Sequence, residues 1–170
     1  MEYQTLIRSR FSVRAYENRS VPDQSMQKVL QAFCLAPTAA NRQPLGLVVV
    51  ETASHQEALQ KVYRPAWFWK QPPLVLCACT TPEQAWTRGD GKCYADVDVA
   101  IAMDHLILAA TDEGLGTCWI GAFDIVAARE ALGLPDDVEP VAWTPLGYPA
   151  DASRPKLRKP LEQLVHYGQW

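Results

Sequence analysis

The stretch from Ala95 to Glu113 constrains the fold most, because it is the longest run of the chain that predicts a single element. Its apolar residues fall on all sides of a helix, whereas a surface helix keeps a polar face. We therefore expect a buried central helix with the other elements packed around it, ended by Gly114 as a C-cap signal. Its most apolar part, Val97 to Ala110, is only 14 residues long and contains three titratable side chains. That segment is too short and too charged to cross a membrane.

Short β-branched or apolar runs alternate loosely with helical patterns in the rest of the chain. We expect strands over 45–51, 73–80, 117–120 and 140–146, and helices over 1–9, 23–36, 54–62 and 124–132. Asp23 and Asp124 stand where N-caps of their helices are expected. Pro145 suggests that the last strand lies at a sheet edge or stops early. At 170 residues, the chain predicts one domain of mixed α and β structure.

The charge balance and the cysteines argue against several classes of function. Sixteen basic and 19 acidic residues leave a net charge of −3, which lacks the footprint of a nucleic-acid-binding protein. The five cysteines form no C-x-x-C pair and lie near no histidine in sequence, so we expect neither a metal site nor a disulfide framework. Reduced cysteines and a charged N-terminus without an apolar leader favour a cytoplasmic protein that does not contact a membrane.

Two basic clusters lie at opposite ends of the chain. Arg10, Ser12 and Arg14 alternate, so an extended segment places them on one side, and Lys156 and Arg158 follow the same pattern. Arginine forks and a serine hydroxyl suit a phosphate group. If the two clusters meet in space, they can hold one dianion. Otherwise each is a solvated charge run, which is the commoner case for such short motifs.

Two loops carry groups that suit a flat heterocyclic ligand. In the segment 37–44, Asn41 and Gln43 can both donate and accept hydrogen bonds, although ordinary loop capping explains them equally well. In the segment 119–123, a strand ends in a glycine before a helix. Backbone N–H groups are partly free at such a turn, and a glycine lets a flat ligand approach.

The acidic residues predict no pair of catalytic carboxylates. Asp96 and Asp98 favour the N-terminus of the long helix through capping and through the helix dipole. His105 is more typical of a core or interface residue than of a general base. We therefore expect the chemistry to come from a bound group rather than from a side-chain acid or base.

Four motifs follow one another in a distinctive order after the R-x-S-x-R segment. They are A-P-T-A-A-N-R-Q-P (36–44), D-V-A-I-A-M-D-H-L-I-L-A-A-T-D-E-G-L-G-T-C-W-I-G-A-F (98–123), L-G-Y-P (146–149) and K-L-R-K-P-L-E-Q-L-V (156–165). In this order the chain resembles the short form of the nitroreductase family of FMN-dependent oxidoreductases, over nearly its whole length. The resemblance implies an α+β fold with a central, mostly antiparallel sheet wrapped by helices. It also implies a single FMN-binding domain over residues 1–170 and an interlocked homodimer with FMN at the interface.

The same resemblance implies three groups of cofactor-binding residues. The first group binds the FMN phosphate and ribityl chain and consists of Arg10, Ser12, Arg14, Lys156 and Arg158. The partner subunit reaches the flavin with Pro37, Thr38, Ala39 and Asn41. Against the isoalloxazine ring lie Ile120, Gly121 and Ala122, with a backbone N–H near N5, where a donor favours the reduced flavin. The aromatic segment 63–69 is left as either a lid over the substrate or part of the dimer core.

The resemblance further implies an NAD(P)H-dependent oxidoreductase. NAD(P)H reduces FMN by hydride transfer to N5, and a small nitroaromatic, quinone or enone-like acceptor then takes the electrons in a ping-pong cycle. The alternative is a flavin-binding protein of the same fold with another role, such as flavin storage or breakdown, dehalogenation or redox sensing. A third possibility is an interaction domain with an empty pocket.

Overall fold

The computed structural model describes residues 1–153 and 155–170. Its helices are α1 (Tyr3–Ser9), α2 (Asp23–Cys34), α3 (Thr52–Val62), α4 (Ala66–Trp69), α5 (Ala95–Asp112) and α6 (Ile125–Leu132). Its strands are β1 (Leu45–Glu51), β2 (Leu74–Thr80), β3 (Gly116–Thr117) and β4 (Glu139–Gly147). Short 3₁₀ turns are η1 (Ala39–Asn41), η2 (Pro82–Gln84) and η3 (Leu161–Gln163).

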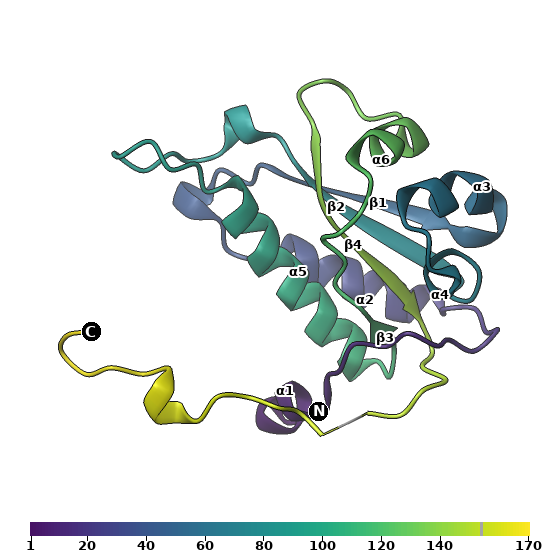
Figure 1. The fold of residues 1–170 in the computed structure, drawn as a ribbon, viewed down its shortest axis with the longest axis horizontal. Coiled ribbons are helices and arrows are strands. Elements are labelled where there is room, and N and C mark those ends of the chain that lie inside the picture. The colour runs from purple at the N-terminus through teal and green to yellow at the C-terminus, as the bar shows by residue number, and fades with distance from the viewer. Residues whose placement is uncertain (154) are drawn as a thin grey trace.

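The strands form one antiparallel sheet in the order β1-β2-β4-β3. Helices cover both faces of this sheet (Figure 1). On one face, α2 and α5 enclose a core that includes Phe33, Leu76 and Leu106. On the other face, α3, α4 and α6 enclose a second core around Phe68 and Trp143. The α+β fold with a central antiparallel sheet is therefore confirmed.

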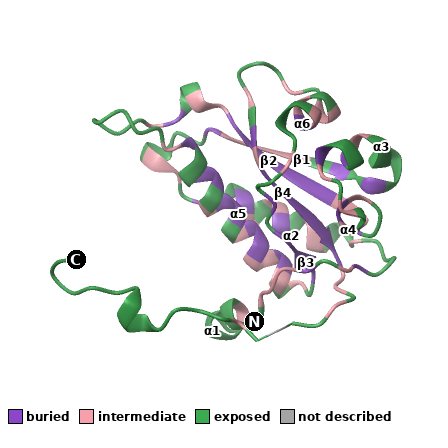
Figure 2. Cartoon of the chain, in the orientation of Figure 1, coloured by how far each residue is buried: buried purple, intermediate pink, exposed green. Residues whose placement is uncertain are grey.

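The long central helix is confirmed in its bounds and place, since α5 runs from Ala95 to Asp112 and packs against both α2 and the sheet. It is not covered all round, because Asp96, Val97 and Ala100 are exposed. The buried residues of the chain concentrate on α5 and the middle strands (Figure 2). Gly114 follows the helix with φ +72°, a left-handed conformation that glycine adopts at little cost.

Three local predictions were wrong. Pro22 is the N-cap of α2, and Asp23 is its first helical residue. The strand expected over 117–120 is two residues long and begins at Gly116. Pro145 lies in β4, between β2 and β3, rather than at an edge or a stop. The proline is tolerated because β3 ends opposite Leu146 and pairing resumes only at Trp143, so Pro145 falls in the gap between these contacts.

In the segment 63–69, expected as a lid or part of a dimer core, Phe68 is buried in the core of the protomer, while the other residues stay partly or fully exposed. Phe68 is fully buried in the second core and makes edge-to-face contacts with Tyr63 and Trp143. Short as it is, α4 thus anchors the aromatic run to the sheet. Aromatic pairs of this kind stabilise a core beyond their buried area.

The C-terminal segment leaves the body of the protein and extends past α1 (Figures 1 and 2). It exposes large apolar side chains, among them Leu157, Leu161, Leu164, Tyr167 and Trp170, the last of them completely. Within the described ranges, the structure holds no helix long and apolar enough to cross a membrane.

Candidate functional site

The two basic clusters meet at the end of the molecule that carries α1. The Lys156 ammonium donates a hydrogen bond to the Ile7 carbonyl at 2.8 Å, which brings the tail against α1 directly before Arg10. Desolvation lowers the pKa of Lys156, and the positive charges of Arg10 and Arg158 lower it further. Both arginines therefore lie close enough to Lys156 to repel its charge.

No carboxylate neutralises this cation cluster, made of Arg10, Lys156 and Arg158. Among the residues that the structure describes, none of the three forms an ion pair. A cluster of like charges is unfavourable by itself, and a dianion relieves its repulsion. The arrangement fits a phosphate group better than two separate solvated charge runs.

The segment 11–14 directly follows Arg10 of this cluster and is fixed by two hydrogen bonds from backbone N–H groups at its C-terminal end. Val13 N–H donates to the Thr117 carbonyl at 2.9 Å, and Arg14 N–H donates to Asp151 Oδ2 at 3.1 Å. Phe11, Ser12, Arg14, Asp151 and Ala152 line a cavity of about 310 Å³. The site thus combines a hydroxyl and a guanidinium next to open space.

Cys118 interacts with Ser12 and Arg14 of this segment. Sequence reasoning did not identify it as a site residue. Burial raises the pKa of its thiol, while Arg14 and a hydrogen bond with Ser12 oppose the rise. Asp151 was missed as well: its second oxygen, Oδ1, is buried and has no partner in the described chain. Both residues are remote from Ser12 in sequence, so no local pattern could reveal the contact.

The turn after β3 continues from the strand to which Val13 is bonded through the Thr117 carbonyl. Ile120 exchanges two backbone hydrogen bonds with Trp143, at 2.8 and 2.9 Å, which fixes the turn on the sheet. Gly121 and Ala122 are exposed, and within residues 1–153 and 155–170 their N–H groups donate to no protein acceptor. Free N–H groups beside an accessible glycine suit the edge of a flat ligand.

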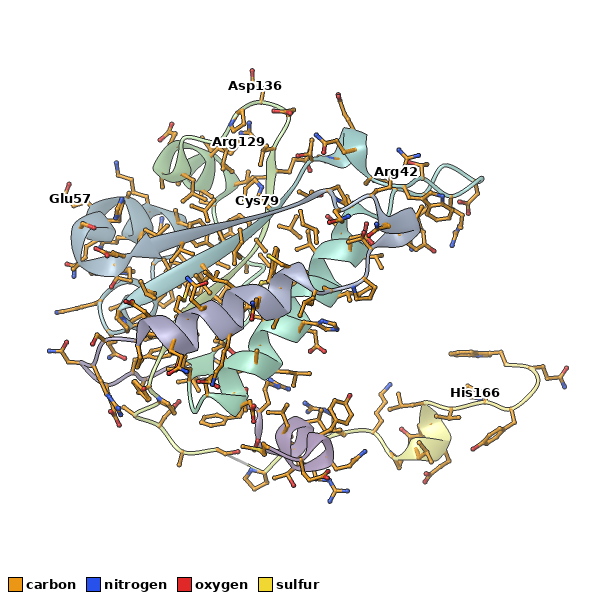
Figure 3. All side chains as sticks on the ribbon, turned by 180° about the vertical axis from the view of Figure 1, so that it is seen from behind. Arg42, Glu57, Cys79, Arg129, Asp136 and His166 are labelled. Carbon is orange, nitrogen blue, oxygen red and sulfur yellow. The ribbon has the colours of Figure 1, made fainter. Side chains whose placement is uncertain are left out.

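The remaining predicted residues lie elsewhere. Pro37, Thr38, Ala39 and Asn41 form the loop around η1, which meets the opposite end of α5: Ala39 N–H donates to Asp98 Oδ1 at 2.8 Å. Since a helix rises about 1.5 Å per residue, the part of α5 from Asp98, which contacts the loop, to Asp112, which the Met1 ammonium contacts, separates the loop from the α1 end by roughly 21 Å. Figure 3 shows Arg42, which directly follows η1, far from α1. One protomer therefore brings the two basic clusters together and leaves the η1 loop apart.

The contact of Asp98 corrects its predicted role. Tyr94, not an aspartate, is the N-cap of α5, and Asp98 is buried against the loop rather than placed for the helix dipole alone. Asp96 stays exposed in the first turn, where the dipole favours its charge. Sequence could not reveal the contact with Ala39, because 59 residues separate the two.

An antiparallel α+β fold with a cation cluster that no described carboxylate neutralises defines a protein with a candidate site for an anionic ligand. Comparison with known proteins gives the family. The nitroreductase family model matches residues 7–87 and 66–148. The chain belongs to the nitroreductase family, as the resemblance indicated.

Three relatives illustrate the similarity. A nitroreductase family protein of Clostridium difficile 630 has a crystal structure that is 34% identical, with a TM-score of 0.91 and 100% of both chains covered. A protein of Archaeoglobus fulgidus, whose name includes NADH dehydrogenase and NAD(P)H nitroreductase, is 31% identical over 86% of this chain and 84% of its own length. A protein of Thermus thermophilus named NADH dehydrogenase is 27% identical over 97% of this chain and 95% of its own.

Proposed function

We propose that the chain is an FMN-dependent oxidoreductase that passes a hydride from NAD(P)H to a small nitroaromatic, quinone or enone-like acceptor. It acts as a single FMN-binding domain over residues 1–170, paired in an interlocked homodimer. The observation that carries the proposal is the cluster of Arg10, Lys156 and Arg158, which lacks a counter-ion among the described residues.

The chain's own residues bind and orient the cofactor. Arg10, Lys156 and Arg158 take the phosphate, and the hydroxyl of Ser12 and the guanidinium of Arg14 face the adjoining chain of the cofactor. The free N–H groups at Gly121 and Ala122 meet the ring edge. When bound, FMN supplies the hydride-accepting N5 atom, so the protein contributes position and electrostatics rather than a side-chain acid or base.

The homodimer is supported by the position of the η1 loop. FMN held by Arg10 at one end of α5 does not reach Asn41 at the other end of the same helix. A second copy supplies the missing loop, so that each site takes its cation cluster from one protomer and Asn41 from the other. The exposed apolar C-terminal segment gives that second copy a surface to bind.

The first test is the absorption spectrum of the purified protein, recorded without oxygen before and after NADPH and then NADH. Flavin bands that bleach with one nucleotide, followed by reoxidation with nitrofurazone or menadione, are the expected result. Flavin bands that no nucleotide bleaches would favour the non-reductase alternative. A protein that is colourless and takes up no FMN would refute the proposal.

The second test addresses the phosphate residues. Removing two charged partners, Arg10→Ala with Arg158→Ala, is expected to strip most FMN from the purified protein, since hydrogen bonds to charged groups contribute about 1.5–3 kcal/mol each. Lys61→Ala with Arg64→Ala removes two exposed charges elsewhere and is the matched control. If the first double variant purifies fully loaded with flavin, the phosphate assignment is wrong.

A further inference from the structure

The loop that follows α2 has an unusual backbone. Ala40, Asn41 and Gln43 have φ values of 52°, 53° and 52°, in the left-handed region that favours glycine. Alanine and glutamine rarely adopt this conformation, because their Cβ atoms crowd the following carbonyl. Three such residues within four positions persist only where the surroundings hold them.

Three side chains hold the loop. Gln43 Nε2 donates to the Asn41 carbonyl at 3.3 Å and to Asn41 Oδ1 at 3.1 Å. Thr38 Oγ1 accepts a hydrogen bond from Gln43 N–H at 3.0 Å and so closes the loop on itself. Asp98 Oδ1, on the first turn of α5, accepts the Ala39 N–H at 2.8 Å and ties the loop to the body of the protein. Asp98 is therefore the long-range attachment point of η1.

Asp98 is costly to bury, which indicates that its position matters. Asp98 is only 1% exposed. Its second carboxyl oxygen, Oδ2, has no hydrogen-bond partner within the described ranges. A buried polar atom without a hydrogen bond destabilises a fold. An interaction with the helix dipole does not require this burial, as the exposed Asp96 on the same turn demonstrates.

We propose that Asp98 is a positioning residue for the cofactor: it holds the 39–43 loop in the left-handed conformation that presents Asn41 to the flavin bound in the partner subunit. The inference rests on the proposed function. Asp98 itself is buried beneath the loop, so its influence on the flavin passes through Ala39 and the backbone. Because α5 also contacts α1, the same helix ties the loop to the half-site at its other end.

Three variants test the role. Asp98→Ala removes the acceptor of the Ala39 N–H, and Asp98→Asn keeps a carbonyl oxygen in its place. Asp96→Ala is the matched control, because it removes a carboxylate from the same helical turn without touching the loop. Each protein is stripped of flavin and titrated with FMN. The visible circular dichroism of the bound flavin and the amide exchange of residues 39–43 are then measured.

The expected result is specific to Asp98→Ala. Loss of a buried hydrogen-bond acceptor corresponds to roughly tenfold weaker FMN binding or more. The flavin dichroism changes and the amides of residues 39–43 exchange faster, while Asp98→Asn largely restores all three properties. Asp96→Ala binds FMN as the wild type does, whatever its melting temperature.

Two results would overturn the inference. One is wild-type FMN affinity and dichroism in Asp98→Ala, even with a lowered melting temperature, since that would leave Asp98 a purely structural role. The other is an equal loss in Asp96→Ala, which would assign the effect to the helix dipole. Failure of the proposed function is distinguishable, because it appears as a wild-type chain that takes up no FMN at all.

Discussion

Substitution of Gly116 by alanine tests how closely the segment 12–14 is fitted against β3. A Cβ atom at Gly116 would lie 2.6 Å from Val13 Cγ2 and 2.9 Å from Val13 Cβ. Val13 is buried and β-branched, so rotation of its side chain offers little relief. The backbone of the segment must therefore shift, and overpacking of this kind costs about 1–3 kcal/mol.

Thermal unfolding of the flavin-free protein measures this cost. One kcal/mol shifts Tm by roughly 2–4 °C in a chain of this size, so Gly116→Ala is expected to melt about 2–12 °C lower. FMN binding should weaken as well, because Ser12 and Arg14 flank Val13. Gly89→Ala, whose added Cβ meets open space, is the control and should leave both properties nearly unchanged.

A double-mutant cycle with Val13→Ala separates the clash from other effects. Because Val13→Ala removes the Cγ2 and Cγ1 contacts at 2.6 and 3.0 Å and leaves only the Cβ contact, the double variant should lose less stability than the sum of the two single variants. Additive losses, or a Gly116→Ala protein that melts and binds FMN like the wild type, would refute the reasoning.

Two further predictions concern stability away from the site. Lys28 and Ser25 donate hydrogen bonds to Glu113, at 2.6 and 2.9 Å, and lower its pKa below the ordinary 4.5. A lowered folded-state pKa stabilises the protein above the unfolded pKa, so the wild type should resist urea better than Glu113→Gln at pH 7, and this advantage should shrink by pH 3. Asp124 Oδ1 accepts the Ala127 N–H at 2.9 Å as the N-cap of α6. Asp124→Ala should therefore lower the free energy of unfolding by about 1 kcal/mol in urea titrations, while Asp124→Asn should retain most of it.

Local sequence patterns were sufficient to predict elements whose structure depends mainly on neighbouring residues. The β-branched run 45–51 forms β1 with the expected bounds, and β2 begins one residue later than expected. Asp124 caps α6 as predicted, because an N-cap depends on residues three positions apart. The all-round apolar pattern of α5 predicted its central place because both α2 and the sheet must cover such a helix.

Contacts between distant segments could not be predicted in this way. The environment of Pro145 depends on where β3 ends, which is not encoded near the proline. Asp98 has the sequence context of a helix-dipole residue, yet its carboxyl group meets Ala39 from another element. The meeting of the two basic clusters was likewise open from sequence alone, since Lys156 reaches α1 across 149 residues.

The proposed dimer gives a common reason for two features that are unfavourable in a single protomer. One is the C-terminal segment, whose Leu157 and Tyr167 side chains are each nearly 90% exposed. The other is the η1 loop, whose left-handed residues are strained. This loop lies too far from Arg10 of its own protomer to contact a ligand bound there. Exposed apolar surface and backbone strain both cost free energy unless a binding partner offsets them. In the proposed dimer a second copy would cover the segment and receive the loop in one assembly step, so the stability of the dimer and the affinity for FMN should fall together when either feature is disturbed.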